Sequence, residues 1–458
     1  MSELTSLNPN SNEGRDIAHH MHGYTNARAH EKNGPMIIER GEGCYVFDTD
    51  GKRYFEAMAG LWSTAVGFNE ERLIEAATRQ MRSLPYYHNF SSKAHGPVID
   101  LAEKLISLAP VPMSKVFFTN SGSEGNDTVL KMIWYRSNAL GQPERKKVIS
   151  RLRGYHGVTI ASASLTGLPN NHRSFDLPLQ GILHTGSPHH YRDALSGESE
   201  EDFATRRAEE LEKMILDEGP ETIAAFWGEP VMGAGGVIVP PKTYWEKIQA
   251  VLKKYDILLV ADEVICGFGR TGKMFGSQTY DIKPDVMVLS KQITSTYFPF
   301  TAIMLNDRVY DPIADESNEI GVLGHGFTGG GHPVGAAIAL ENIKIIEERN
   351  LVSNAAETGE YMQRKLRELT HHPLVGEARG VGMIGAIELV SDKEKKAPLG
   401  AAGKLGTIAN AAMQRHGVIS RNMLDALAFC PPLIATEADI DLMIDATQKS
   451  LDEVQAAL

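Results

Sequence analysis

A series of short apolar segments, each followed by small or polar residues, constrains the fold of this chain most strongly. The sequence predicts five such strands, at residues 115–119, 148–150, 223–227, 257–261 and 286–289. Near-continuous apolar strands are typical of a parallel sheet whose two faces are both covered. Helical patterns between the strands, such as those at 204–216 and 243–255, predict crossover connections that cover these faces.

The segments on either side of this region predict a second, smaller domain. Residues 40–56 alternate as in a hairpin that turns at Asp50-Gly51, and residues 383–389 read as another strand. We therefore expect both termini to build the smaller domain together. The predicted boundaries are 1–69 for the N-terminal segment and hairpin, 70–335 for the large domain, and 336–458 for a linking helix and the C-terminal part.

Composition narrows the class of protein. The chain has 458 residues, a net charge of −12 and no basic cluster, which argues against a nucleic-acid partner. No apolar run reaches membrane-spanning length, so we predict no membrane partner. The polar N-terminus lacks the apolar region of a signal peptide, and the three cysteines suit a reducing compartment. We therefore predict a cytoplasmic protein.

Open parallel sheets bind ligands beyond the carboxyl ends of their strands, so the residues that follow the predicted strands are the first candidates. These are Asn120–Gly125, Gly154–Gly157, Glu229-Pro230, Asp262–Val264 and Ser290-Lys291. The Ser121-Gly122-Ser123 segment offers N–H groups and hydroxyls at a helix N-terminus, which suits a phosphate. The alternative is a simple helix cap with Ser123 as the capping residue.

Asp262 and Lys291 each follow a buried strand. A buried carboxylate is costly unless it is paired, and the plain alternative for Asp262 is an ion pair with Arg270. A desolvated lysine tends to a lowered pKa and can attack carbonyl groups, although a surface lysine is the commoner case. A phosphate cradle, an acid and an amine in one crevice are the groups that pyridoxal 5′-phosphate requires.

Two other patterns are weaker. Residues 267–272 fit G-x-G-x-x-G, but no apolar-periodic helix follows them, which disfavours a dinucleotide site or a P-loop. The spacing of His19, His20, His22 and His30 matches no standard zinc pattern, and no cysteine pair accompanies them. The sequence therefore predicts no metal site.

From about Tyr24 to the C-terminus, the chain resembles the class III, or omega, aminotransferases of pyridoxal-phosphate fold type I, and the amine:pyruvate branch most closely. The segments that carry the resemblance are Ser121–Glu124, Tyr155–Gly157, Asp262–Gly272, Leu289–Gln292 and Phe327–Pro333. It implies an α/β fold whose large domain holds a mostly parallel seven-stranded sheet, with a smaller α+β domain built from both termini. It also implies pyridoxal 5′-phosphate as cofactor.

The resemblance assigns roles to individual residues. Lys291 would form the Schiff base with the cofactor and then shuttle the proton, while Asp262 would pair with the pyridinium nitrogen. Tyr155 would stack on the ring, and these three are the expected catalytic residues. The other expected cofactor contacts are Ser121, Gly122 and Ser123 at the phosphate, Val264 on the second ring face, Glu229, and Thr328, which would reach the phosphate of a neighbouring subunit. This implies a homodimer with shared active sites and leaves a tetramer open.

The expected substrate residues follow from the same resemblance. Leu61, Trp62 and Phe90 match the pocket of amine:pyruvate enzymes, although core packing is the plain alternative for the two aromatic residues. Arg421 matches a mobile arginine that pairs with a substrate carboxylate and swings aside for apolar amines. Ala234 stands where the ornithine- and GABA-type branches carry a glutamate that gates this arginine, which argues against those branches.

The predicted reaction is ping-pong transamination through pyridoxamine phosphate. An amino group would pass from a primary amine, or an ω-amino compound, to a keto acid such as pyruvate. Two alternatives remain. A diaminopelargonate-type or polyamine aminotransferase would keep the fold and change the donor. A pyridoxal-phosphate-binding protein without turnover would keep only the binding site.

Overall fold

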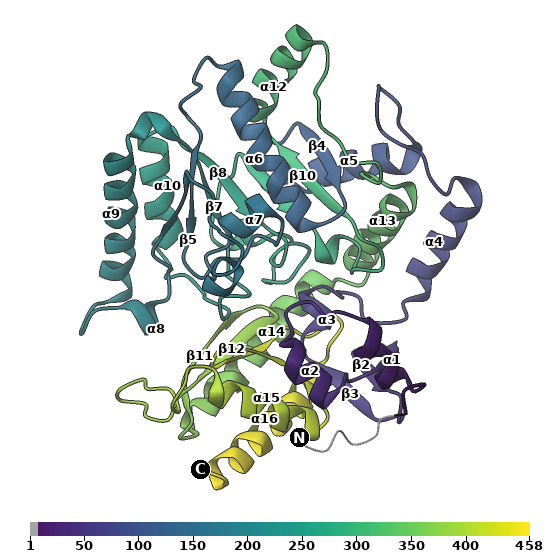
Figure 1. The fold of residues 1–458 in the computed structure, drawn as a ribbon, viewed down its shortest axis with the longest axis vertical. Helices are drawn as coiled ribbons and strands as arrows, with labels where there is room; N and C mark the ends of the chain where they lie inside the picture. Colours follow the sequence, from purple (N-terminus) through teal and green to yellow (C-terminus); the bar gives the residue numbers. More distant parts are fainter. Residues whose placement is uncertain (1–7) are drawn as a thin grey trace.

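The computed structural model describes residues 8–458. A seven-stranded sheet with its helices fills the upper part of the molecule in Figure 1, and elements from both ends of the chain fill the lower part. We call these parts the large-sheet region and the terminal region. Within residues 8–458, no helix combines the length and the apolar character that a membrane span requires.

The large sheet has the strand order β4-β10-β9-β8-β7-β5-β6. Its strands are β4 (Lys115–Thr119), β5 (Lys147–Arg151), β6 (Ile182–Thr185), β7 (Ile223–Gly228), β8 (Leu258–Asp262), β9 (Val286–Leu289) and β10 (Thr301–Leu305). Only β10 runs against its neighbours, so the sheet is mostly parallel. The structure confirms the five strands predicted from apolar runs. It adds β6, a short edge strand, and β10, whose direction no apolar pattern encodes.

Helices cover both faces of this sheet, which explains why its strands are apolar throughout. Alternate residues of β8 show the two faces: Val260 packs in a cluster with Ile133 of α6, whereas Leu259 packs in another with Ile248 of α10. The helices of this region are α4 (Glu71–Ser83), α5 (Gly96–Leu108), α6 (Gly122–Ala139), α7 (Ile160–Leu165), α8 (His190–Asp193), α9 (Glu200–Glu218), α10 (Tyr244–Lys254), α11 (Gly276–Thr279), α12 (Asp307–Ile320) and α13 (Pro333–Glu348).

The terminal region joins the two ends of the chain in one sheet. Val418 of β13 pairs in parallel with Phe55 of β3, which is the second strand of the predicted hairpin. The two small sheets contain β1 (Ile38–Glu42), β2 (Tyr45–Asp48), β3 (Arg53–Glu56) and β13 (Val418–Ile419), then β11 (Val375–Val381), β12 (Ile384–Leu389), β15 (Ala426–Phe429) and β14 (Arg421–Met423). The helices are α1 (Asn12–His19), α2 (Ala27–Asn33), α3 (Ala59–Trp62), α14 (Leu351–Glu368), α15 (Lys404–Arg415) and α16 (Glu437–Ala456). The domain boundaries at residues 69 and 335 stay predictions.

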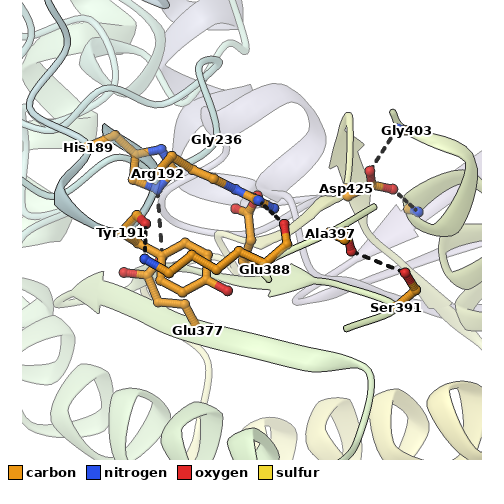
Figure 2. Close-up of polar contacts among 12 residues, drawn as sticks. His189, Tyr191, Arg192, Gly236, Glu377, Glu388, Ser391, Ala397, Gly403 and Asp425 are labelled. Carbon is orange, nitrogen blue, oxygen red and sulfur yellow. Dashed lines mark hydrogen bonds and ion pairs between the residues drawn. The ribbon is translucent and has the colours of Figure 1, made fainter. Parts of the chain in front are cut away.

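A network of charged side chains ties the two regions together (Figure 2). Arg192 of α8 donates to Glu388 of β12 at 2.7 Å, and Arg379 of β11 donates to the same carboxylate at 2.7 Å. Arg379 also donates to the carbonyl oxygen of Gly236 at 2.6 Å, in the loop that follows β7. Because both guanidinium groups converge on Glu388, this buried carboxylate is neutralised. The network fixes the small sheet that carries β14, and with it Arg421, against the large-sheet region.

Candidate functional site

A cleft of about 260 Å³ lies at the carboxyl ends of the parallel strands, where the sequence placed the site. Every predicted cofactor residue except Thr328 lines it, namely Ser121, Gly122, Ser123, Tyr155, Glu229, Asp262, Val264 and Lys291. Segments far apart in the chain therefore converge as the strand-end argument requires. Asn126 and His156, to which the sequence assigned no role, also line the cleft.

The N-terminus of α6 forms one wall of the cleft. Ser121, not Ser123, caps this helix, because its side chain accepts the N–H of Glu124 at 3.2 Å. Within residues 8–458, the N–H groups of Gly122 and Ser123 have no hydrogen-bond acceptor. Free N–H groups at the positive end of a helix dipole suit a phosphate, so the structure fits this part of the expected cofactor.

A glycine allows the loop after β5 to approach this helix. Gly157 has a φ of +136°, and a Cβ atom there would lie 2.5 Å from the Oγ of Ser123. No other residue could keep this spacing without a shift of the loop. Gly157 therefore brings Tyr155 and His156 close to the free N–H groups of α6.

Three groups orient the carboxylate of Asp262, which ends β8 and is only 3% exposed. His156 Nδ1 lies 2.8 Å from its Oδ2, Asn126 Nδ2 donates to the same oxygen at 3.0 Å, and the N–H of Val264 donates to Oδ1 at 3.1 Å. The expected alternative, an ion pair with Arg270, is wrong. That side chain instead donates to Gln292 Oε1 at 3.1 Å and to backbone carbonyls.

Lys291 begins a short 3-10 turn directly after β9 and lines the cleft with its side chain. Its φ of +46° is unusual for a residue with a side chain, and such strain is common at functional sites. Burial lowers the pKa of its amine, while the negative charges of Asp262 and Glu229 act against this shift. A lowered pKa makes the neutral, nucleophilic amine more accessible. Lys291 is half-buried in the lining of the cleft, which argues against the surface-lysine alternative.

Glu229 holds the backbone beside Tyr155. One carboxylate oxygen accepts the N–H of Tyr155 at 3.0 Å, and the other accepts the N–H of Gly233 at 3.0 Å. Burial raises the pKa of Glu229, and it also raises the pKa of the Tyr155 hydroxyl, to which Tyr24 contributes further. Glu229 thus links the loop carrying Tyr155 to the loop carrying Ala234.

The predicted substrate residues lie outside the lining of this cleft. Leu61 is 55% exposed, Phe90 is 44% exposed, and Trp62 is 3% exposed in an apolar cluster with Met58 and Val231, so core packing accounts for Trp62 within one chain. Arg421 is half-buried, and its charge influences both Tyr155 and Lys291. Within residues 8–458, the guanidinium of Arg421 has no hydrogen bond or ion pair. Half-buried Ala234 offers it none.

Glu56 secures the loop around α3, an irregular turn in which Gly60 and Leu61 have non-helical backbone angles and which carries Leu61 and Trp62. This carboxylate ends β3, is 4% exposed and accepts the N–H of Gly60. The loop is strained, since Ala59 and Trp62 both have positive φ values, of 47° and 64°. Burial raises the pKa of Glu56 to about 8.

We expect the raised pKa of Glu56 to make folding stability depend on pH. The folded chain keeps this proton up to about pH 8, whereas an unfolded glutamate releases it near pH 4.5. The stabilisation is complete below the lower value and is lost as pH rises through the higher one. Glu56→Gln removes this proton exchange. From pH 5 to pH 8.5, the free energy of unfolding of wild type should therefore fall by a few kcal/mol more than that of the variant. Urea unfolding of both proteins at both pH values measures this difference. An equal fall in the free energy of unfolding of the two proteins would contradict the raised pKa of Glu56.

Comparison with known proteins places the chain in a family. The family model for class III aminotransferases matches residues 26–451. A probable gamma-aminobutyrate transaminase 3 of Oryza sativa subsp. indica is 49% identical over 430 residues, which cover 92% of this chain and 84% of that protein. Gamma aminobutyrate transaminase 1 of Solanum lycopersicum is 49% identical over 422 residues, which cover 92% and 82%.

Solved structures agree with this placement. The omega transaminase of Pseudomonas jessenii in complex with PMP is 62% identical, with a TM-score of 0.97 over 97% of this chain and 98% of that one. A transaminase solved with L-Ala is 69% identical, with a TM-score of 0.92 over 92% and 100%. The predicted fold class, family, cofactor and reaction are thereby confirmed. The chain belongs to the class III aminotransferases, and it is a transaminase that uses pyridoxal 5′-phosphate.

Proposed function

We propose that this transaminase moves an amino group from a primary amine, or an ω-amino compound, to a keto acid such as pyruvate. The observation that carries the proposal is the cleft that joins Lys291, Asp262 and Tyr155 to the N-terminus of α6. When bound there, pyridoxal phosphate supplies an electron sink for negative charge at the substrate carbon. The remaining chemistry falls to side chains of this protein.

Each wall of the cleft has a distinct task in this proposal. The free N–H groups of Gly122 and Ser123, with the hydroxyl of Ser121, would bind the phosphate. Asp262, oriented by His156 and Asn126, would hold a proton on the ring nitrogen. Tyr155 and Val264, which both line the cleft, would contact the ring. Lys291 would hold the cofactor and would move the proton at the substrate carbon as general base and acid.

Arg421 allows the same site to accept an apolar amine and a charged keto acid in turn. A buried cation without a partner is costly, so a fixed arginine would reject the amine. The half-buried guanidinium of Arg421 has no partner among residues 8–458, and Ala234 supplies no carboxylate to hold it. We infer that this side chain turns toward a substrate carboxylate and moves aside for an apolar group.

Arg421→Ala should therefore weaken the keto-acid half-reaction selectively. A charge-assisted hydrogen bond contributes about 1.5–3 kcal/mol, which corresponds to a loss of roughly ten- to a hundred-fold in kcat/KM for pyruvate. The half-reaction with a carboxylate-free amine should change far less. Following the two half-reactions separately by cofactor absorbance measures both effects. Equal losses in both would show that Arg421 supports the fold or the cofactor.

A donor panel tests the substrate class directly. The purified enzyme is mixed with pyruvate and one donor at a time, and alanine formation is measured. An apolar aryl-alkyl amine represents the leading proposal. This choice is supported by an omega transaminase that is 62% identical to this chain and was engineered for asymmetric synthesis of enantiopure bulky amines. γ-Aminobutyrate is a second candidate, because relatives 49% identical are named for it. A diamine and a diaminopelargonate-type donor complete the panel. The proposal would be refuted if the enzyme turned over neither the aryl-alkyl amine nor any ω-amino compound.

A homodimer with shared active sites is part of the proposal. Thr328 and Phe90 do not line the cleft of their own chain. They lie in neighbouring segments, since the Tyr86 hydroxyl donates to the Thr328 carbonyl oxygen at 2.9 Å and Phe90 contacts Gly326. We propose that this surface completes the site of a second subunit.

We also propose a cytoplasmic location, which the three buried, unpaired cysteines favour.

A further inference from the structure

The N-terminal helices bring three imidazole rings to one carboxylate, far along the chain from the cleft residues. Asp16 Oδ2 lies 2.8 Å from His22 Nε2 and 3.0 Å from His30 Nε2, and Asp16 Oδ1 lies 2.9 Å from His20 Nδ1. The ring centroid of His22 lies 4.2 Å from that of His20 and 4.3 Å from that of His30. Asp16 comes from α1 and His30 from α2, so folding, not sequence spacing, assembles this group.

The donor atoms of three residues in this group lie close enough together to share one metal ion. One ligand atom each from Asp16, His22 and His30 lies within 4.8 Å of the others. Zinc bonds of about 2.0–2.2 Å to nitrogen and oxygen place neighbouring ligand atoms about 3.4 Å apart. The observed separations of 2.8 and 3.0 Å therefore need to open by only about half an ångström. His22 and Asp16 are partly exposed, which leaves room for this adjustment.

We propose that Asp16, His22 and His30 together bind a divalent transition-metal ion of the zinc type. Imidazole and carboxylate ligands suit borderline ions such as Zn²⁺ and Co²⁺ better than Ca²⁺. The histidine spacing alone predicted no such site, because Asp16 and the packing of α2 beside α1 are absent from that pattern.

A second group of possible ligands, His189, Glu377 and Glu388, is not such a site. Arginine side chains already occupy its carboxylates, and Figure 2 draws Arg192 among this group. Arg379 donates to Glu377 at 2.6 Å and to Glu388 at 2.7 Å, so its positive charge stands where a cation would bind. No comparable cation faces the Asp16 carboxylate among residues 8–458, where its partners are imidazoles.

The proposed ion would brace a loop that reaches the cleft. Tyr24 follows His22 in the loop between α1 and α2, and its hydroxyl accepts a hydrogen bond from Asn171 Nδ2 at 2.6 Å. Its ring lies 6.4 Å from the ring of Tyr155, which lines the cleft. A metal ion joining α1 to α2 would therefore restrict the segment that packs against Tyr155.

Metal titration of the untagged holoenzyme tests the proposal. The protein is freed of metal with EDTA and titrated with ZnCl₂ by calorimetry, and with CoCl₂ by visible absorption. We expect one ion per chain for wild type. Removal of a ligand in His22→Ala or His30→Ala should weaken binding by at least about tenfold. His19→Ala is the matched control, because this neighbouring histidine makes no hydrogen bond or ion pair with Asp16, and the variant should bind the metal as wild type does.

Two results would overturn the proposal. One is a wild-type dissociation constant for the metal ion above about 100 μM. The cluster would then be held by carboxylate–imidazole hydrogen bonds alone. The other is tight binding that His22→Ala and His30→Ala leave unchanged, which would place the ion elsewhere. The wild-type titration decides the first point even where a variant fails to fold. Because the readout is metal binding, its failure does not affect the proposed transamination.

Discussion

Lys291→Ala should lose essentially all multiple turnover while keeping its fold. The variant removes the amine in the cleft that is placed to attach the cofactor and to carry the substrate proton. General acid–base catalysis alone contributes about 10²–10⁴-fold, so we expect kcat to fall by at least roughly 10³-fold. Steady-state alanine formation measures this loss. The visible absorbance of the protein-bound cofactor should change with it.

Two further variants separate the amine from its charge. Lys291→Arg keeps a positive charge but supplies no neutral nucleophile, so it should be as inactive as Lys291→Ala. Lys273→Ala, at an exposed position directly after the mostly buried glycine-rich segment 267–272, is the matched control and should keep the wild-type rate. A wild-type rate and absorbance in Lys291→Ala would show that the site has been assigned wrongly.

Asp262→Asn should fold, bind the cofactor and lose most of its activity. Asparagine has nearly the same shape, and its single oxygen can still accept from Val264 or from His156, but not from both, because these two groups bond different carboxylate oxygens. The negative charge at the end of β8 disappears. Without that charge, the ring nitrogen no longer holds its proton, and the electron sink weakens. Loss of one preorganised electrostatic contact costs about 10²–10³-fold in kcat, and we expect a decrease of this size.

The control for Asp262→Asn is a carboxylate at the opposite end of the sheet. Asp285 precedes β9 and accepts the N–H of Leu259 at 2.9 Å, outside the cleft. Asp285→Asn should therefore change stability at most and leave kcat unaltered. An unchanged kcat in Asp262→Asn, with normal cofactor binding by equilibrium dialysis, would reduce Asp262 to a structural hydrogen-bond acceptor.

The large-sheet region was predictable because its strands are buried on both faces. Apolar runs such as Val286–Leu289, fully buried in the structure, have no other stable location in a chain of this composition. The edge strand β6 carries His184 and Thr185, so its apolar signal is weak. β10 has a clear apolar run, but hydrophobicity carries no information about strand direction, and its antiparallel pairing with β4 and β9 was not predicted.

The site was predictable where chemistry and strand ends coincide. Asp262 is the last residue of one buried strand and Lys291 lies two residues after another, so the strand-end rule placed both in the cleft. Asn126 was missed because it lies one turn inside α6, where a buried amide reads as ordinary packing. His156 had a signal, since it directly follows Tyr155, but no pattern named Asp262 as its partner.

The sequence by itself determined which chemical groups this protein carries and on which strand ends they stand, because local burial and turn chemistry are written along the chain. Tertiary structure decided their partners. Ser121 rather than Ser123 caps α6, Arg270 bonds Gln292 rather than Asp262, and Asp16 meets His22 and His30. Hydrogen bonds and ion pairs act over a few ångströms, so they depend on distances that sheet pairing and helix packing set, and one-dimensional spacing does not contain those distances.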